Sequence, residues 1–181
     1  MLILGNINAL ASFKKNKLLE QLEAINKNIS DVSAEFLHFV DHKNNLDKEP
    51  EAKLKELLTY DQQYTADRSG SLFLVIPRPG TISPWSSKAT DIAKNSGLRD
   101  VNRIERGTAY YIEGSKPGDF NAISKLIHDR MTQSVVANAD NAKSMFESEE
   151  PETYTEIDIA KDGKSALENA RPIAIAFTAE W

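Results

Sequence analysis

The stretch from Leu72 to Asp91, LFLVIPRPGTISPWSSKATD, constrains the fold more than any other part of the sequence. Its five apolar residues, Leu72 to Ile76, predict a strand that is buried on both faces. The prolines and the glycine that follow exclude regular structure until Ser86, Ser87 or a near neighbour can cap a helix. The sequence therefore predicts a strand, a stiff loop and a helix, in that order.

The predicted loop carries an unusual set of side chains, which are Arg78, Thr81, Ser83, Trp85, Ser86, Ser87 and Lys88. An arginine can form two hydrogen bonds with a carboxylate or phosphate, and the N–H groups of a helix start favour an anion. One interpretation is a loop that meets a substrate or another domain. The other is a stiff connector in which Trp85 fills the core and the charges are solvated. The glycine spacing of a Walker A loop is absent before Lys88.

Composition narrows the class of protein. A chain of 181 residues can form one solid domain plus an extension, and its 40% hydrophobic and 27% charged content is typical of soluble proteins. The absence of cysteine excludes disulfides, thiolate nucleophiles and Cys-ligated metals, and it suits a cytoplasmic protein. There is no apolar run long enough to cross a membrane, and the net charge of −5 argues against nucleic acid as a partner.

The remaining segments predict two successive strand–helix–strand–helix halves, residues 2–66 and 72–137. The expected strands are 2–4, 32–40, 72–76 and 101–113, and the expected helices are 12–28, 50–58, 87–95 and 117–136. Gly107 is a candidate β-bulge. The predicted fold class is α+β, a two-layer sandwich of duplicated halves with a mainly antiparallel sheet and helices on one face. Strand 72–76 should be a central strand.

The C-terminal part has a different character. Residues 138–154 are polar and acidic, which predicts a solvated linker after a domain of residues 1–137. A short strand is expected at 157–159 and a short helix at 164–171. The final apolar run IAIAF, close before Trp181, favours residues 138–181 being a linker and the truncated start of a further domain.

Other polar residues suggest weaker site hypotheses. His38 and His42 invite a metal site, but on a strand they would lie about 13 Å apart, so no metal site is predicted. Glu105 and Arg106 can form an internal ion pair or a surface that meets another domain. His128 and Arg130 favour a surface or interdomain contact. No arrangement typical of catalytic residues occurs, so no catalytic residue is predicted.

The segment PRPGTISPWSSKATDIA resembles the N-terminal region of the large, single-chain phosphoribosylformylglycinamidine synthases. Seven further short segments match the same family. They are Ala34-Glu35, His38-Phe39, Gly97-Leu98, Val101-Asn102-Arg103, Glu105-Arg106-Gly107, Ala109-Tyr110-Tyr111 and His128-Asp129-Arg130-Met131. The resemblance covers roughly residues 3–132 and continues weakly to about residue 176.

The resemblance implies a function for a longer protein. These enzymes are ligases of purine biosynthesis that use ATP, magnesium and glutamine-derived ammonia to convert formylglycinamide ribonucleotide to its amidine. By resemblance, the chain is a fused dimer of the small separate subunit used by other versions of the enzyme. It would dock onto the synthetase and glutaminase domains of the same chain, and the loop of residues 78–88 would border the substrate or ammonia path. No cofactor is expected in this part, which should be inactive alone and a monomer or weak dimer. The alternative is an independent binding module for a phosphorylated ligand or an acidic partner.

Overall fold

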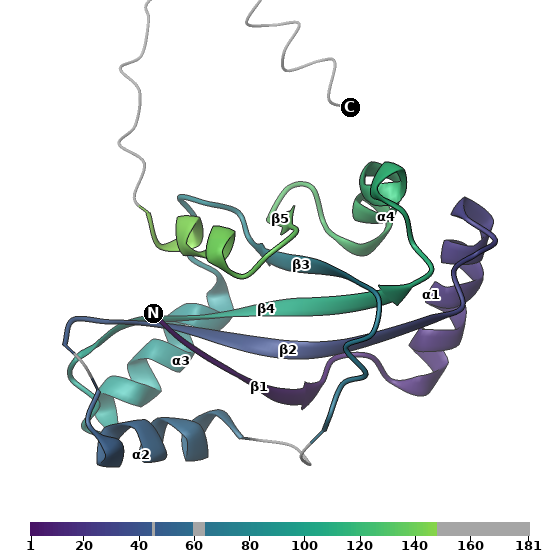
Figure 1. The fold of residues 1–181 in the computed structure, drawn as a ribbon. Coiled ribbons are helices and arrows are strands. Elements are labelled where there is room, and N and C mark those ends of the chain that lie inside the picture. Colours follow the sequence, from purple (N-terminus) through teal and green to yellow (C-terminus); the bar gives the residue numbers. More distant parts are fainter. Residues whose placement is uncertain (45, 60–63, 148–181) are drawn as a thin grey trace, which may run out of the picture. The chain divides into compact units, whose positions relative to one another are not determined.

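The computed structural model describes residues 1–44, 46–59 and 64–147, and these form one five-stranded antiparallel sheet with helices. The strands are β1 (Leu2–Asn8), β2 (Asp31–His42), β3 (Ser71–Pro77), β4 (Val101–Glu113) and β5 (Gln133–Val136). Their order across the sheet is β1-β2-β4-β3-β5 (Figure 1). The two longest strands, β2 and β4, pair along their whole length at the centre of the sheet.

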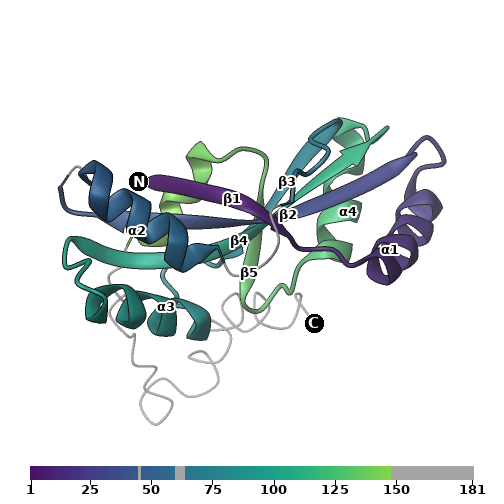
Figure 2. The same ribbon diagram turned by 90° about the horizontal axis from the view of Figure 1, so that it is seen from below.

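The four α-helices are α1 (Ser12–Ile25), α2 (Lys48–Leu58), α3 (Pro84–Asn95) and α4 (Phe120–Ile127). They cover one face of the sheet as two separate pairs, with α2 and α3 at one end and α1 and α4 at the other (Figure 2). Two 3₁₀ helices, η1 (Pro117–Asp119) and η2 (Asp140–Phe146), complete the described elements. Because successive strand residues face opposite sides, each strand serves two cores.

Three clusters of buried side chains make up these cores. Val40 and Ile104 pack beneath Leu54 of α2 and Ala93 of α3. At the other end of the same face, Val32 and Ile112 pack beneath α1 and α4. On the opposite face, η2 covers Leu37, Phe39, Leu74 and Ile76 with its fully buried residues Ala142 and Met145.

The predicted α+β class with an antiparallel sheet and helices on one face is confirmed. Strand β3 is internal, as its apolar sequence predicts, because it pairs with β4 on one side and β5 on the other. Leu74 and Val75 each have a partner on both sides, Ala109 and Val136 for Leu74 and Thr108 and Val135 for Val75. The order β1-β2-β4-β3 is the one that two halves related by a twofold axis between β2 and β4 would produce. That the halves superpose stays a prediction.

The prediction of one helix over residues 117–136 is wrong. Helix α4 ends at Ile127, and residues 133–136 form strand β5 instead. The reason is a tight turn closed by Asp129, whose carboxylate accepts hydrogen bonds from the Met131 amide and the Thr132 hydroxyl. An Asp that bonds to its own following backbone competes with helix formation. Val135 and Val136 then pair with β3, where β-branched residues fit well.

The candidate bulge at Gly107 is also wrong, because β4 keeps an unbroken register with β2 there. The glycine serves close packing instead. A Cβ atom at this position would lie 2.8 Å from the Val75 carbonyl oxygen and 3.0 Å from the Phe39 ring. The register shifts occur elsewhere, between Leu4 and Ile7 and between Asp41 and His42. The first shift lets β1 continue to Asn8, beyond its predicted end.

Two predicted boundaries need correction. Helix α1 ends at Ile25 rather than near Asn28, and the Asn26 side chain accepts a hydrogen bond from the Asn28 amide in the turn that follows. The solvated linker predicted over 138–154 is wrong for residues 140–146, because η2 buries Ala142 and Met145 completely. The strand predicted at 157–159 and the helix predicted at 164–171 lie outside the described residues. Met1–Glu149 form one compact unit.

Candidate functional site

Hydrogen bonds fix the first residue of the β3–α3 loop (residues 78–83) and close a turn inside it. The Arg78 amide donates to the Thr132 carbonyl at 3.0 Å, next to the pairing of β3 with β5. The Thr81 amide and hydroxyl donate to the Arg78 carbonyl at 3.1 Å and 2.6 Å, around a turn in which Gly80 has a φ of +77°. That backbone conformation favours glycine, so the turn explains the Pro-Gly pair in the sequence.

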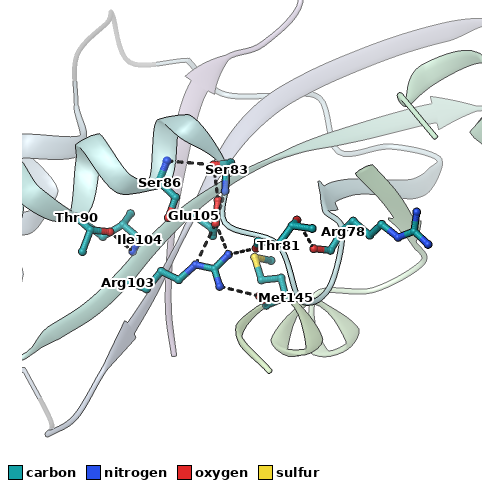
Figure 3. A network of polar contacts seen from close by, with 9 residues as sticks. All are labelled: Arg78, Thr81, Ser83, Ser86, Thr90, Arg103, Ile104, Glu105 and Met145. Carbon is teal, nitrogen blue, oxygen red and sulfur yellow. Dashed lines mark hydrogen bonds and ion pairs between the residues drawn. The ribbon is translucent and has the colours of Figure 1, made fainter. Parts of the chain in front are cut away.

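A buried carboxylate, Glu105, anchors the loop to the sheet (Figure 3). It accepts hydrogen bonds from the Ser83 amide at 3.2 Å and from the Ser83 hydroxyl at 2.8 Å. It also accepts from Nε of Arg103 at 3.1 Å and forms an ion pair with Nη2 of the same side chain. Hydrogen bonds to the ionised form satisfy a carboxylate that is removed from water.

Arg103 extends this network to two further segments. Its guanidinium donates to the Thr81 carbonyl in the loop and, at 3.2 Å, to the Met145 carbonyl of η2 (Figure 3). The same guanidinium lies 5.5 Å from the centroid of the Phe146 ring. Loop, β4 and η2 are therefore joined by one arginine. The sequence analysis missed its role, although the spacing of Arg103 and Glu105, two residues apart on a strand, places both on one face.

Helix α3 begins at the end of this loop. Ser83 is its N-cap, and its hydroxyl accepts a hydrogen bond from the Ser86 amide at 3.0 Å. Pro84 occupies the first helical turn, where its missing N–H costs nothing. Further along, the Thr90 hydroxyl accepts from the Ile104 amide at 2.9 Å, beyond the end of the β3–β4 pairing. A side chain from the middle of α3 thus accepts a hydrogen bond from a β4 backbone amide that no described strand pairs with on that side.

Most predicted loop residues are exposed, namely Arg78, Thr81, Ser87 and Lys88, whereas Ser83 and Trp85 are half-buried and Ser86 is buried. Among the described residues, the four ion pairs involve neither Arg78 nor Lys88. The indole of Trp85 packs against the cluster beneath α2 and α3. The loop therefore combines a rigid, internally bonded backbone with cationic side chains that face solvent.

Arg106 does not pair with its neighbour Glu105, because adjacent strand residues point to opposite faces. Its guanidinium lies on the helix-covered face, 4.4 Å from the centroid of the Phe36 ring and 5.0 Å from that of Trp85. Beside it, the buried His38 ring lies 5.4 Å from the Trp85 ring. Burial, and secondarily the charge of Arg106, lower the pKa of His38 to about 4, so this imidazole is neutral at pH 7.

A cleft opens beside this stack, and we call it the central cleft. It has a volume of about 450 Å³, and its walls come from the loop, the two central strands and the turn before β5. The lining residues are Phe36, Pro77, Thr81, Ile82, Ser83, Pro84, Trp85, Arg106, Thr108, Met131, Thr132 and Gln133. A smaller apolar hollow of about 190 Å³ lies between α2 and α3, on the other side of Trp85.

A second buried carboxylate, Glu35, lies on the same face of the sheet as Glu105. It accepts hydrogen bonds from Nε of Arg68 at 2.8 Å and from the Tyr111 hydroxyl at 2.9 Å. Burial and the bond to this carboxylate raise the pKa of Tyr111 to about 12. Sequence reasoning missed this group because Arg68 comes from a polar stretch without a periodic pattern.

The remaining candidates do not gather into one site. Nδ1 of His128 contacts the Ser124 carbonyl within α4, and Arg130 is exposed in the following turn. Nδ1 of His42 lies 2.7 Å from the Asn44 carbonyl, whereas His38 is buried in the cluster described above. Within the part of the chain that the structure describes, no three His, Asp or Glu side chains are grouped as metal ligands would be. Nor does any helix of that part have the length and apolarity to cross a membrane.

Comparison with protein families shows which family contains the loop, the strands and the helices described above. Residues 35–146 match the family described as formylglycinamide ribonucleotide amidotransferase N-terminal. The matched region runs from the buried Glu35 in β2 to Phe146 at the end of η2, and it includes the β3–α3 loop, Arg103 and Glu105. It covers more than half of the chain, including most of β2 and all of β3, β4 and β5. The chain belongs to the N-terminal domain family of the formylglycinamide ribonucleotide amidotransferases of purine biosynthesis.

Proposed function

We propose that this chain is the docking domain of a glutamine-dependent, ATP-using ligase that converts formylglycinamide ribonucleotide to its amidine. In such an enzyme it binds the synthetase and glutaminase domains of the same polypeptide, and the β3–α3 loop meets the synthetase domain. ATP and magnesium act in those other domains, as the family resemblance implies. The chain alone has no ligase or glutaminase activity.

One observation carries this proposal: hydrogen bonds hold the β3–α3 loop in place, while Arg78 of the loop and Lys88 of the following helix α3 are exposed. The loop is bonded to Thr132, to Glu105 and to Arg103, yet Arg78 and Lys88 are exposed. A connector between a strand and a helix needs neither the buried carboxylate nor two cationic side chains at the surface. A preorganised surface of this kind loses little conformational entropy when it meets another domain.

Hydrogen exchange tests the docking. The amides of residues 78–83 are followed in the 181-residue chain alone and in the complete enzyme under the same conditions. We expect slower exchange in the complete enzyme, because a docked surface excludes water from this segment. The segment 114–119, which is exposed apart from the half-buried Ser115 and Asp119, serves as the internal control and should exchange equally in both. Equal exchange of residues 78–83 in the two proteins would refute the proposed docking surface.

The alternative function is an independent binding module for a phosphorylated ligand or an acidic partner. The exposed Arg78 and Lys88 favour it as well, because both can pair with an anion. A direct distinction comes from assaying the purified chain for ADP release that depends on formylglycinamide ribonucleotide, and from sequencing the gene downstream of the Trp181 codon. Substrate-dependent ADP release would contradict the inactive docking domain, and a stop codon after Trp181 would favour the module.

A further inference from the structure

The central cleft has apolar rims on two different segments. Ile82 of the loop is 63% exposed and Met131 of the turn before β5 is 71% exposed, and both line the cleft. Phe36 and Trp85 add two aromatic rings to its walls. Large apolar side chains that remain in water around one concave surface are typical of a binding site for another protein.

A single guanidinium lies among these apolar groups. The guanidinium carbon of Arg106 lies 4.4 Å from the centroid of the Phe36 ring and 5.0 Å from that of the Trp85 ring. A guanidinium keeps its positive charge over aromatic rings, and its planar fork of donors matches the geometry of a carboxylate. Trp and Arg are also the residue types that contribute most binding energy in protein interfaces.

Arg106 is the one charged side chain among the described residues that line the cleft, in a chain whose net charge is −5. Arg78 of the loop and Arg130 of the turn before β5 are exposed on segments that form its walls. The acidic residue of the same turn, Asp129, already accepts hydrogen bonds from Met131 and Thr132. Glu105 is buried on the opposite face, where it is bonded to Ser83 and Arg103. An acidic partner therefore complements this surface.

Three of the four hydroxyl groups that line the cleft are used within the protein, which argues against a small phosphorylated ligand. The Thr81 hydroxyl donates to the Arg78 carbonyl, and that of Thr132 donates to Asp129. The Ser83 hydroxyl donates to Glu105 and accepts from the Ser86 amide. A phosphate site needs several donors for its oxygens, and these three donors are already used within the protein.

We propose that the central cleft binds an extended acidic segment of another polypeptide, or of another domain, through one large apolar side chain and one adjacent carboxylate. The apolar side chain inserts between Ile82 and Met131 against the two aromatic rings, and the carboxylate pairs with Arg106. This inference deepens the proposed function, on which it rests, by stating the chemistry that a docked domain presents to this face.

The test measures peptide binding to the 181-residue chain by fluorescence anisotropy. The labelled probe is a synthetic peptide with the sequence Gly-Ser-Asp-Glu-Leu-Phe-Asp-Glu-Ser-Gly. One control peptide carries Asn and Gln in place of Asp and Glu, and another carries Ser and Gly in place of Leu and Phe. We expect a dissociation constant of about 100 µM for the probe, and binding at least about tenfold weaker for each control, because both contacts are required.

Variants locate the binding surface. Met131→Glu places a like charge on the exposed rim without touching the core, and it should weaken binding of the probe about tenfold or more. Arg106→Gln should weaken the acidic probe but not the Asn/Gln peptide. The matched control is Phe13→Glu, because Phe13 is 80% exposed on α1 and does not line the cleft. This control should bind the probe as the parent does.

Equal binding of the three peptides, no measurable binding of the probe, or full affinity in Met131→Glu would overturn the proposal. Displacement of the probe by inorganic phosphate at constant ionic strength would also overturn it, in favour of a phosphate site. The docking proposal fails separately. If the chain does not bind the peptide but residues 78–83 are still protected in the complete enzyme, only the proposed peptide binding by the cleft is refuted. If the chain binds the peptide but residues 78–83 are not protected, only the docking of the loop is refuted.

Discussion

Glu35 and Glu105 occupy matching positions in the two central strands, each two residues before the paired residues Leu37 and Gly107. Both carboxylates are fully buried, and each accepts hydrogen bonds from an arginine. Their partners differ, since the side chain of Arg68 is 58% exposed and that of Arg103 is 17% exposed. The Glu105 pair is therefore the better shielded from solvent, and it alone joins the β3–α3 loop to the sheet.

Replacing Glu105 with Gln should lower the free energy of unfolding by about 2–4 kcal/mol, because the substitution leaves Arg103 without its charged partner in a buried site. Urea unfolding measures the change. Glu51→Gln is the matched control, since Glu51 pairs with Lys55 on the surface of α2 and its loss should cost about 0.5 kcal/mol or less. A Glu105→Gln variant as stable as the parent would show that the network does not hold the loop.

Gly107→Ala tests the close packing between β4, β3 and Phe39. The new Cβ would meet the Val75 carbonyl oxygen at 2.8 Å, and backbone cannot yield cheaply, so we expect a loss of about 1–3 kcal/mol. Thermal or urea unfolding provides the measurement. Gly118→Ala is the control, because a Cβ there meets nothing within 4 Å. Equal stabilities of the two variants would contradict the packing described for Gly107.

Stability should depend on pH through His38. Its pKa falls from 6.5 to about 4 in the native state, so the unfolded state binds a proton that the native state does not. The stabilising effect of the neutral ring is complete above about pH 6.5 and is lost as the pH falls toward 4, at a cost of about 3 kcal/mol. Urea unfolding between pH 7 and 4 should therefore show a steeper loss for the parent than for His38→Gln. Parallel curves would disprove the shift.

The main elements follow from the sequence because their signals are local. Three of the predicted strands match observed ones. The strand predicted at 32–40 matches β2, that at 72–76 matches β3 and that at 101–113 matches β4. Gly97, expected to end a helix, has a φ of +91° just after α3. These signals need no knowledge of distant contacts.

The errors come from contacts that the sequence pattern does not reveal. The apolar residues of 117–136 fit a helical period, but Asp129 closes a turn and β3 offers a partner for Val135 and Val136. The polar segment containing η2 was expected to be solvated, yet Met145 and Ala142 fill a hollow on the sheet. For the site, Glu105 bonds to Arg103 rather than to the adjacent Arg106, because strand geometry separates neighbours.

The central claim, that the β3–α3 loop serves the other domains of an amidotransferase, is tested most directly by Arg78→Ala in the complete enzyme. Amidine formation and glutamine hydrolysis are measured together, with the melting temperature as a check on folding. We predict that amidine formation falls about tenfold or more, the loss of about 1.4 kcal/mol of positioning, while glutamine hydrolysis falls less and ammonia is wasted. Normal amidine formation with a melting temperature several degrees lower would contradict the claim and leave the loop a purely structural role.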